Sequence, residues 1–282
     1  GPMDCGGVDV EARALGCLAV LEQAFEAFCA EASPTFFAAL PSEWKMNVYV
    51  GGTGLVHPGD PGYAHQGTTP DEPLPGVRKQ PCLCVSPVAL GDECAAVHEF
   101  VHCLQFLSGG FRDSAHVGFL WEAHAEYLVH CFRPRDPRWT HHADHFLKTA
   151  NCSWEMTRTT SESKANGRQY CVWPLLAWAD ARHPGLANRI WHADALHRAR
   201  AGTSRDPLTT LVACGLLTSW GGGVDAPWLA RSPLPGTPSS GQVSGLALAD
   251  LFGEFARDSA TADWFSDDGV DRAVLGAPGS PV

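Results

Sequence analysis

The sequence predicts an α+β fold in which a small, strand-containing N-terminal lobe is followed by a mainly helical C-terminal lobe. Residues 44–50 alternate apolar and polar side chains, which is the period of a strand. A second short apolar run follows at 82–86, and most later apolar residues recur every three or four positions, as in helices. We expect the N-terminal lobe to span residues 3–132, the helical lobe 133–265 and a tail 266–282.

Composition and charge narrow the class of protein. The 282 residues are 45% hydrophobic and 18% charged, which suffices for a sizeable core. The formal net charge is −11 and Lys and Arg do not cluster, so nucleic acid is not an expected partner. No apolar run reaches the roughly 18 residues of a transmembrane segment. Gly1-Pro2 looks like a tag scar; we expect a cytoplasmic protein if Met3 is the native start, and a secreted one if the sequence was trimmed.

The first predicted element is an amphipathic helix that ends before Ser33-Pro34. Its apolar residues recur at spacings of three and four, so they should face the core. This stripe consists of Leu15, Leu18, Leu21, Phe25 and Phe28.

The strand at 44–50 is followed by a glycine-rich turn and then by a segment without a regular period. Several prolines and glycines predict a loop over 55–80. Loops this long in compact domains are usually functional or disordered, so we expect it to border a cleft. The strand at 82–86 should then offer an edge to an extended peptide, with Cys84 and Val85 as substrate-binding residues.

Two helices come next. Either Ser86-Pro87 or Gly91-Asp92 could begin the first, with Pro in its first turn or Asp as its N-cap. It should end at Ser108-Gly109-Gly110, because glycine favours the helix C-terminus. The second is expected at 117–132, before Arg133-Pro134. Further helices are predicted at 141–150, 170–182, 186–199, 207–217 and 246–259.

The first of these helices carries His98-Glu99-Phe100-Val101-His102. Residues four apart share a helix face, so His98 and His102 can direct both imidazoles at one metal ion. Glu99, one step round the helix, can reach a water on that ion. This HExxH arrangement is typical of zinc hydrolases, in which the Glu acts as general base.

A catalytic zinc site needs a third protein ligand. The metzincin pattern would require Gly at 105 and His at 108, where this chain has Gln105 and Ser108, so that class is excluded. The other common solution is a Glu from the following helix, and Glu122 lies twenty residues after the second histidine. Glu126 shares its face and could accept a hydrogen bond from a ligand histidine. His124 points to another face and is not expected to be a ligand.

The segments Val97–Gln105 and Phe119–Ala125 resemble the gluzincins, the thermolysin-like zinc peptidases. In those enzymes HExxH is followed by a Glu ligand on the next helix and by an acidic residue four positions later, often Asp where this chain has Glu126. The same segments are similar to an uncharacterised family of predicted secreted gluzincin-type proteins, in which Gln follows the motif. The specific match covers about residues 80–132.

The resemblance implies a zincin-like fold and one catalytic Zn²⁺ bound by His98, His102 and Glu122. It implies a metallopeptidase that hydrolyses a peptide or protein substrate, with Glu99 as general base. Gluzincins usually stabilise the tetrahedral oxyanion with a Tyr or His from the helical lobe, and we expect Tyr170 to fill that role.

Two other functions are compatible with these residues. A zinc hydrolase could act on a non-peptide amide or ester. A non-catalytic protein could use the cleft as a peptide-binding groove, although an intact Glu99 argues against it. If no metal binds, His98 and His102 would be core histidines, and Glu122 and Glu126 would lie on a solvated helix face.

Overall fold

The computed structural model describes seven stretches of the chain and several single positions. They are residues 9–31, 46–51, 64–68, 81–111, 117–139, 168–182 and 185–202, with 141, 142, 145, 204, 207, 210, 211 and 214. The helix expected at 246–259 and the tail at 266–282 lie outside these residues. The chain divides into two compact units, Gly1–Ser108 and Gly109–Val282. Among the described helices, none has the length and apolarity needed to cross a membrane.

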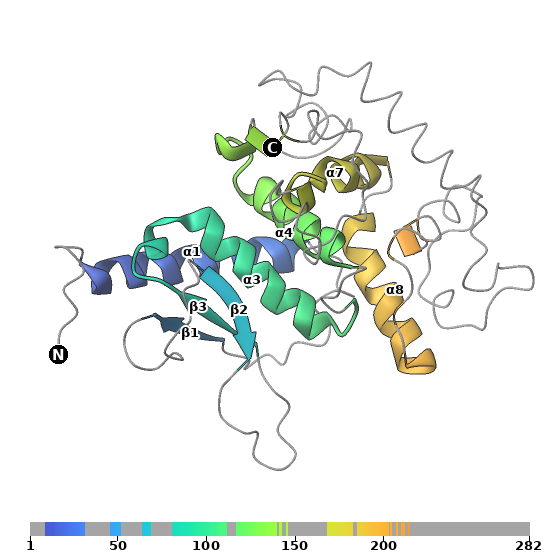
Figure 1. Cartoon of the computed structure of the whole chain (residues 1–282), viewed down its shortest axis with the longest axis horizontal. Coiled ribbons are helices and arrows are strands. Elements are labelled where there is room, and N and C mark those ends of the chain that lie inside the picture. The colour runs from blue at the N-terminus through green and yellow to red at the C-terminus, as the bar shows by residue number, and fades with distance from the viewer. Residues whose placement is uncertain are drawn as a thin grey trace, which may run out of the picture. The chain divides into compact units, whose positions relative to one another are not determined.

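The first unit combines helices with a small mixed sheet, which confirms the α+β class (Figure 1). Its elements are α1 (Val10–Glu31), β1 (Asn47–Val50), β2 (Ala64–Thr68), β3 (Pro81–Val85), the 3₁₀ turn η1 (Ala89–Gly91) and α3 (Glu93–Ser108). The strand order is β1-β3-β2, with β1 parallel and β2 antiparallel to β3. Helix α3 packs on β2, β3 and α1, so it lies in the core of this unit.

The central position of β3 overturns one expectation about substrate binding. Cys84 lies opposite Tyr49 of β1 and His65 of β2. Val85 is likewise paired on both sides and is only 1% exposed. An extended peptide cannot add to β3, because both of its edges already pair with strands. The assignment of Cys84 and Val85 as residues that bind a substrate backbone is therefore wrong.

Strand β2 lies within the segment predicted to be a loop, so that prediction is wrong at 64–68. Its sequence, Ala-His-Gln-Gly-Thr, has no alternation of large apolar side chains. The strand pairs with β3 through its backbone, and backbone pairing leaves no signal in the side-chain pattern. Among the described strands, β2 has a neighbour on one side only and is therefore an edge strand.

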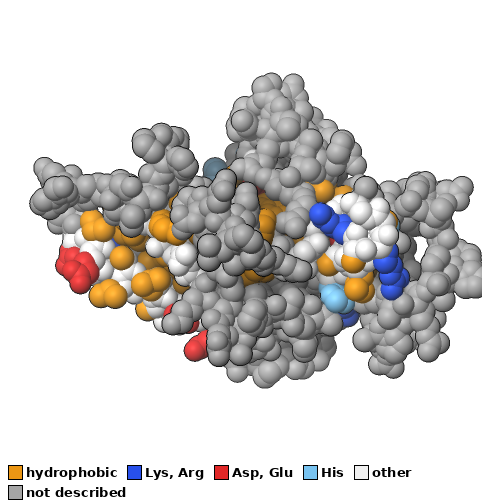
Figure 2. Space-filling model, turned by 90° about the horizontal axis from the view of Figure 1, so that it is seen from below, with side chains coloured by type: hydrophobic (Ala, Val, Ile, Leu, Met, Phe, Trp, Pro, Cys, Tyr) orange, Lys and Arg blue, Asp and Glu red, His pale blue; other side chains and the backbone are white. Residues whose placement is uncertain are grey.

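Helix α1 forms where predicted and ends before Ser33, but its buried face differs from the predicted stripe. Leu15 and Leu18 are 62% and 43% exposed, and Figure 2 shows apolar side chains at the surface on the side where Figure 1 places α1. Leu21 and Phe28 of the predicted stripe are buried, and the other buried residues are Cys17, Val20 and Ala24. These share one helix face. The prediction was based on the largest apolar residues. The small side chains of Cys17 and Ala24 instead allow the elements that pack on α1 to approach it closely.

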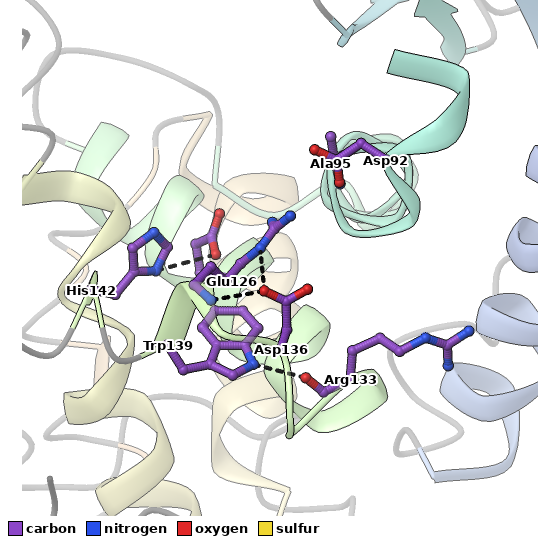
Figure 3. Close-up of polar contacts among 8 residues, drawn as sticks. Asp92, Ala95, Glu126, Arg133, Asp136, Trp139 and His142 are labelled. Carbon is purple, nitrogen blue, oxygen red and sulfur yellow. Dashed lines mark hydrogen bonds and ion pairs between the residues drawn. The ribbon is translucent and has the colours of Figure 1, made fainter. Parts of the chain in front are cut away.

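Both helix-start signals that the sequence offers before α3 are used, the first by the 3₁₀ turn η1 and the second by α3. The Ala89 N–H donates to Ser86 Oγ at 3.2 Å, at the start of η1. The Ala95 N–H donates to Asp92 Oδ1 at 2.9 Å, so Asp92 is the N-cap of α3 (Figure 3). At the other end Gly109 adopts a φ of 73°, the left-handed conformation that the glycine signal predicted.

The second unit is helical over the residues that the structure describes. It contains α4 (Gly118–Phe132), the 3₁₀ turn η2 (Arg168–Tyr170), α7 (Trp173–Arg182) and α8 (Leu186–Ala201). Helix α4 packs on η2 and α7, and α7 packs on α8. The predicted lobe boundary after residue 132 placed α4 with the strands, but its packing partners group it with the helices.

A single carboxylate links three helices of this unit. The Tyr127 hydroxyl on α4 donates to Asp180 Oδ2 on α7 at 2.9 Å. The Ala187 N–H, in the first turn of α8, donates to Asp180 Oδ1 at 2.9 Å. Buried polar groups are stable only when such bonds are made, so this network helps to fix how α4, α7 and α8 pack.

His130, on α4, is fully buried between two tryptophan rings. Its ring stacks on Trp173, with centroids 4.5 Å apart, and meets Trp139 edge-on at 5.0 Å. Neither ring nitrogen has a hydrogen-bond partner among the described residues. Burial lowers the pKa of His130 to about 4, because an imidazolium ion would lose its hydration there. At neutral pH the buried ring is therefore uncharged.

Acidification should destabilise the second unit through His130. Between the folded-state pKa of about 4 and the ordinary value of 6.5, the unfolded chain binds a proton that the folded chain does not. In that window the free energy of unfolding should fall by up to about 1.4 kcal/mol for each pH unit of acidification, and this contribution should level off below it. Urea unfolding at several pH values measures the slope.

The matched control is His130→Phe, which keeps an aromatic ring and removes the titrating group. Its pH slope between these two values should be shallower by about one proton. The same slope in both proteins would contradict the assignment of this acid sensitivity to His130.

Candidate metal centre

Two histidines on α3 direct ring nitrogens at one point. His98 and His102 are 6% and 5% exposed, so both side chains are buried. The Nε2 atom of His102 lies 3.0 Å from the Nε2 atom of His98. Their rings are nearly perpendicular, at 88°, with centroids 4.6 Å apart. The structure therefore brings these two predicted ligands together.

Glu99 completes the cluster. The ligand atoms of His98, Glu99 and His102 all lie within 4.8 Å of one another. Among the described residues this is the one group of three or more His, Cys, Asp and Glu side chains that meets this condition. Glu99 is half-buried whereas both histidines are buried, so its carboxylate can reach solvent.

The local sequence explains this placement. Val97, Val101 and Leu104 form one helical stripe and are at most 1% exposed, so they anchor α3 in the apolar core. His98 and His102 follow one position later on the neighbouring stripe. The core packing of the apolar residues thus sets the direction of both histidines.

Gln105 extends the histidine stripe by three residues, and the sequence prediction missed its contact. Its Oε1 atom lies 2.7 Å from His102 Nδ1, and the glutamine is fully buried. An amide oxygen only accepts hydrogen bonds, so this contact suits a His102 ring whose proton lies on Nδ1. In the sequence, Gln105 served to exclude a metzincin and formed part of a family resemblance, but no contact with His102 was predicted. The spacing of three residues between His102 and Gln105 was the signal in the sequence that could have indicated this contact.

Cys103 lies beside the cluster but is not suited to be a nucleophile. Burial raises the pKa of the Cys103 thiol well above its ordinary value, and the nearby Cys82, Glu99 and Cys84 raise it further. The thiol therefore stays protonated, whereas the thiolate is the reactive form.

Glu122 and Glu126 lie in the second unit, on α4. They are 2% and 5% exposed, so the alternative that placed them on a solvated helix face is wrong. A buried carboxylate needs a cation or hydrogen-bond donors to offset the loss of hydration. Glu126 Oε2 lies 3.5 Å from His142 Nδ1 (Figure 3). The roles of Glu122 as third ligand and of Glu126 as partner of a ligand histidine stay predictions.

His124 contacts α8 of the same unit. Its Nε2 lies 3.0 Å from Asn188 Oδ1, and its ring packs on Trp191 with centroids 5.1 Å apart. Glu126, two residues further along α4, instead contacts His142. His124 therefore has a packing role within the second unit.

Tyr170, the expected oxyanion donor, is half-buried and ends η2. The predicted helix at 170–182 begins only at Trp173, after this 3₁₀ turn. Its role in catalysis stays a prediction.

Comparisons with known proteins place the chain in a family. Searches of curated protein sequences and of solved structures found no match. The family of unknown function DUF6055 matches residues 15–213, a segment that contains the HExxH motif and helix α4. Because the match covers more than half of the 282 residues, the protein belongs to the DUF6055 family.

Proposed function

We propose that this protein is a zinc-dependent metallopeptidase of the gluzincin type, with a zincin-like fold. The observation that carries the proposal is the convergence of His98 Nε2 and His102 Nε2, 3.0 Å apart, beside the Glu99 carboxylate. The packing of α3 on a small mixed sheet and the helical second unit support the fold assignment.

The donor set suits zinc. Imidazole nitrogen and carboxylate oxygen are both common zinc ligands, at about 2.0–2.2 Å. Tetrahedral zinc with bonds of that length separates two ligand nitrogens by roughly 3.3 Å, close to the 3.0 Å between the two Nε2 atoms. The residues present therefore fit the metal with little movement.

Glu122 is the third ligand in this proposal. Its spacing from the HExxH motif is that of the gluzincins, and the break at Gly109-Gly110 separates the two helices. His98, His102 and Glu122 would together leave one coordination position for water.

Each residue of the proposed site then has one role in the hydrolysis. Zinc, when bound by these residues, supplies a Lewis acid that lowers the pKa of water and polarises a carbonyl group. Glu99 takes a proton from the attacking water and passes it to the leaving amine. Tyr170 donates a hydrogen bond to the developing oxyanion. The half-buried position of Glu99 suits its task, because the carboxylate must meet both water and substrate.

The substrate strand pairs with β2 rather than with β3. Strand β2 is an edge strand among those described, and it packs against α3, which carries the metal ligands. An extended peptide on that edge would gain backbone hydrogen bonds with little dependence on sequence. This arrangement favours a peptide over a small amide or ester.

Glu99→Gln should abolish hydrolysis without loss of the metal. Glutamine keeps the size of the side chain but cannot act as a base, and general acid–base catalysis typically contributes about 10²–10⁴-fold in rate. We expect at least a 100-fold fall in kcat on the best peptide from a library, with unchanged zinc content and thermal stability. The control is Glu93→Gln, an exposed position on the first turn of α3. Unchanged turnover in Glu99→Gln would contradict the mechanism.

Glu122→Gln should weaken zinc binding. A neutral amide removes the charged ligand, so we expect a loss of more than about 100-fold in zinc affinity, beyond the 10–100-fold that neighbours of ligands contribute. Elemental analysis and competition with a chelator measure stoichiometry and affinity. His124→Gln is the control, because this buried position on the same helix contacts Asn188. Wild-type zinc affinity in Glu122→Gln would show that the third ligand lies elsewhere.

A further inference from the structure

We propose that Gln105 is a positioning residue that holds His102 in the tautomer able to bind a metal ion. The inference rests on the proposed zinc site, since it concerns the lone pair that His102 offers there. It assigns to Gln105, for this histidine, the supporting role that the sequence had suggested for Glu126. Within the second unit Glu126 contacts His142.

The contact is short, buried and local. Gln105 Oε1 lies 2.7 Å from His102 Nδ1, and the two side chains are 0% and 5% exposed. Three residues apart on one helix, they face each other through the geometry of α3 alone. The Ser108 hydroxyl donates to the Gln105 backbone carbonyl at 2.6 Å, which ties down the same helical turn. Water has little access to compete for this hydrogen bond.

The chemistry of an amide makes the contact directional. The glutamine oxygen only accepts, so the proton of a neutral His102 ring must lie on Nδ1. Nε2 is then left with a lone pair, and this is the atom that lies 3.0 Å from His98 Nε2. Without the glutamine oxygen, the proton could lie on Nε2 and block the metal.

Glutamine also suits the charge of the site. Metal-binding histidines usually donate their second N–H to a carboxylate, a backbone carbonyl or water. A carboxylate at position 105 would add a buried negative charge to a cluster that already contains Glu99. Glutamine supplies the same acceptor without that charge. Gln105 therefore orients the ligand at low electrostatic cost.

The test measures the tautomer directly and the metal affinity separately. Long-range ¹H–¹⁵N spectra of the full-length protein with ¹⁵N-labelled histidine, recorded before and after a chelator removes bound metal, report which nitrogen of His102 carries the proton. We expect Nδ1–H in the wild type in both states. Gln105→Leu should lose this preference in the metal-free state and bind zinc 10–100-fold more weakly in competition with a chelator.

Two further variants separate orientation from packing. Gln105→Glu keeps an oxygen acceptor and should restore the Nδ1–H tautomer and zinc affinity relative to Gln105→Leu. Ser108→Ala removes a hydrogen bond from the same turn but leaves the acceptor, so it should behave as the wild type. A wild-type His102 with its proton on Nε2 in the metal-free state would overturn the proposal. So would a wild-type zinc affinity in a folded Gln105→Leu protein.

The peptidase proposal can fail independently of this one. If no peptide is cleaved, or if Glu99→Gln keeps its activity, the function is wrong. The tautomer of His102 and the dependence of zinc affinity on Gln105 would still stand, because neither readout requires turnover.

Discussion

The packing of α3 into the core of the first unit is the constraint on which the candidate site depends. Helix α3 packs on the sheet and α1, and its stripe of Val97, Val101 and Leu104 is at most 1% exposed. His98 and His102 lie on the neighbouring stripe, so the packing of the helix also fixes the direction in which they point. A metal site built on a packed helix is more rigid than one on loops, so the cost of arranging its ligands is already met by folding.

The structure places several ionisable groups inside the protein. In the second unit, Glu122, Glu126 and His130 are spaced four apart along α4, and each is at most 5% exposed. The loss of hydration on burial is offset in a different way for each of these three side chains. His130 avoids charge by losing its proton, Glu126 lies beside His142, and we assign Glu122 to a metal ion. Buried charges cost stability unless they are paired, so the packing of α4 depends on such compensation.

Because the protein belongs to a family of unknown function, the candidate site also bears on other members of that family. The matched segment, residues 15–213, includes the HExxH helix, α4 and Tyr170. Zinc binding by this protein would therefore provide a specific hypothesis for its relatives. The proposed substrate arrangement, with an extended peptide on the edge strand β2, directs that hypothesis toward extended peptides.

The sequence alone determined the features that arise within a few residues. Gly109 marks the end of α3 because caps act within one helical turn, and the helical period places His98 and His102 on one face. For the start of α3 the sequence left Ser86-Pro87 and Gly91-Asp92 open, and the structure shows Asp92 as its N-cap. Only the tertiary structure decided the rest. Strand β2 exists because β3 offers it a backbone partner, and α1 buries its small residues where another element approaches. Both depend on segments distant in the chain, and so does the contact of Glu126 on α4 with His142.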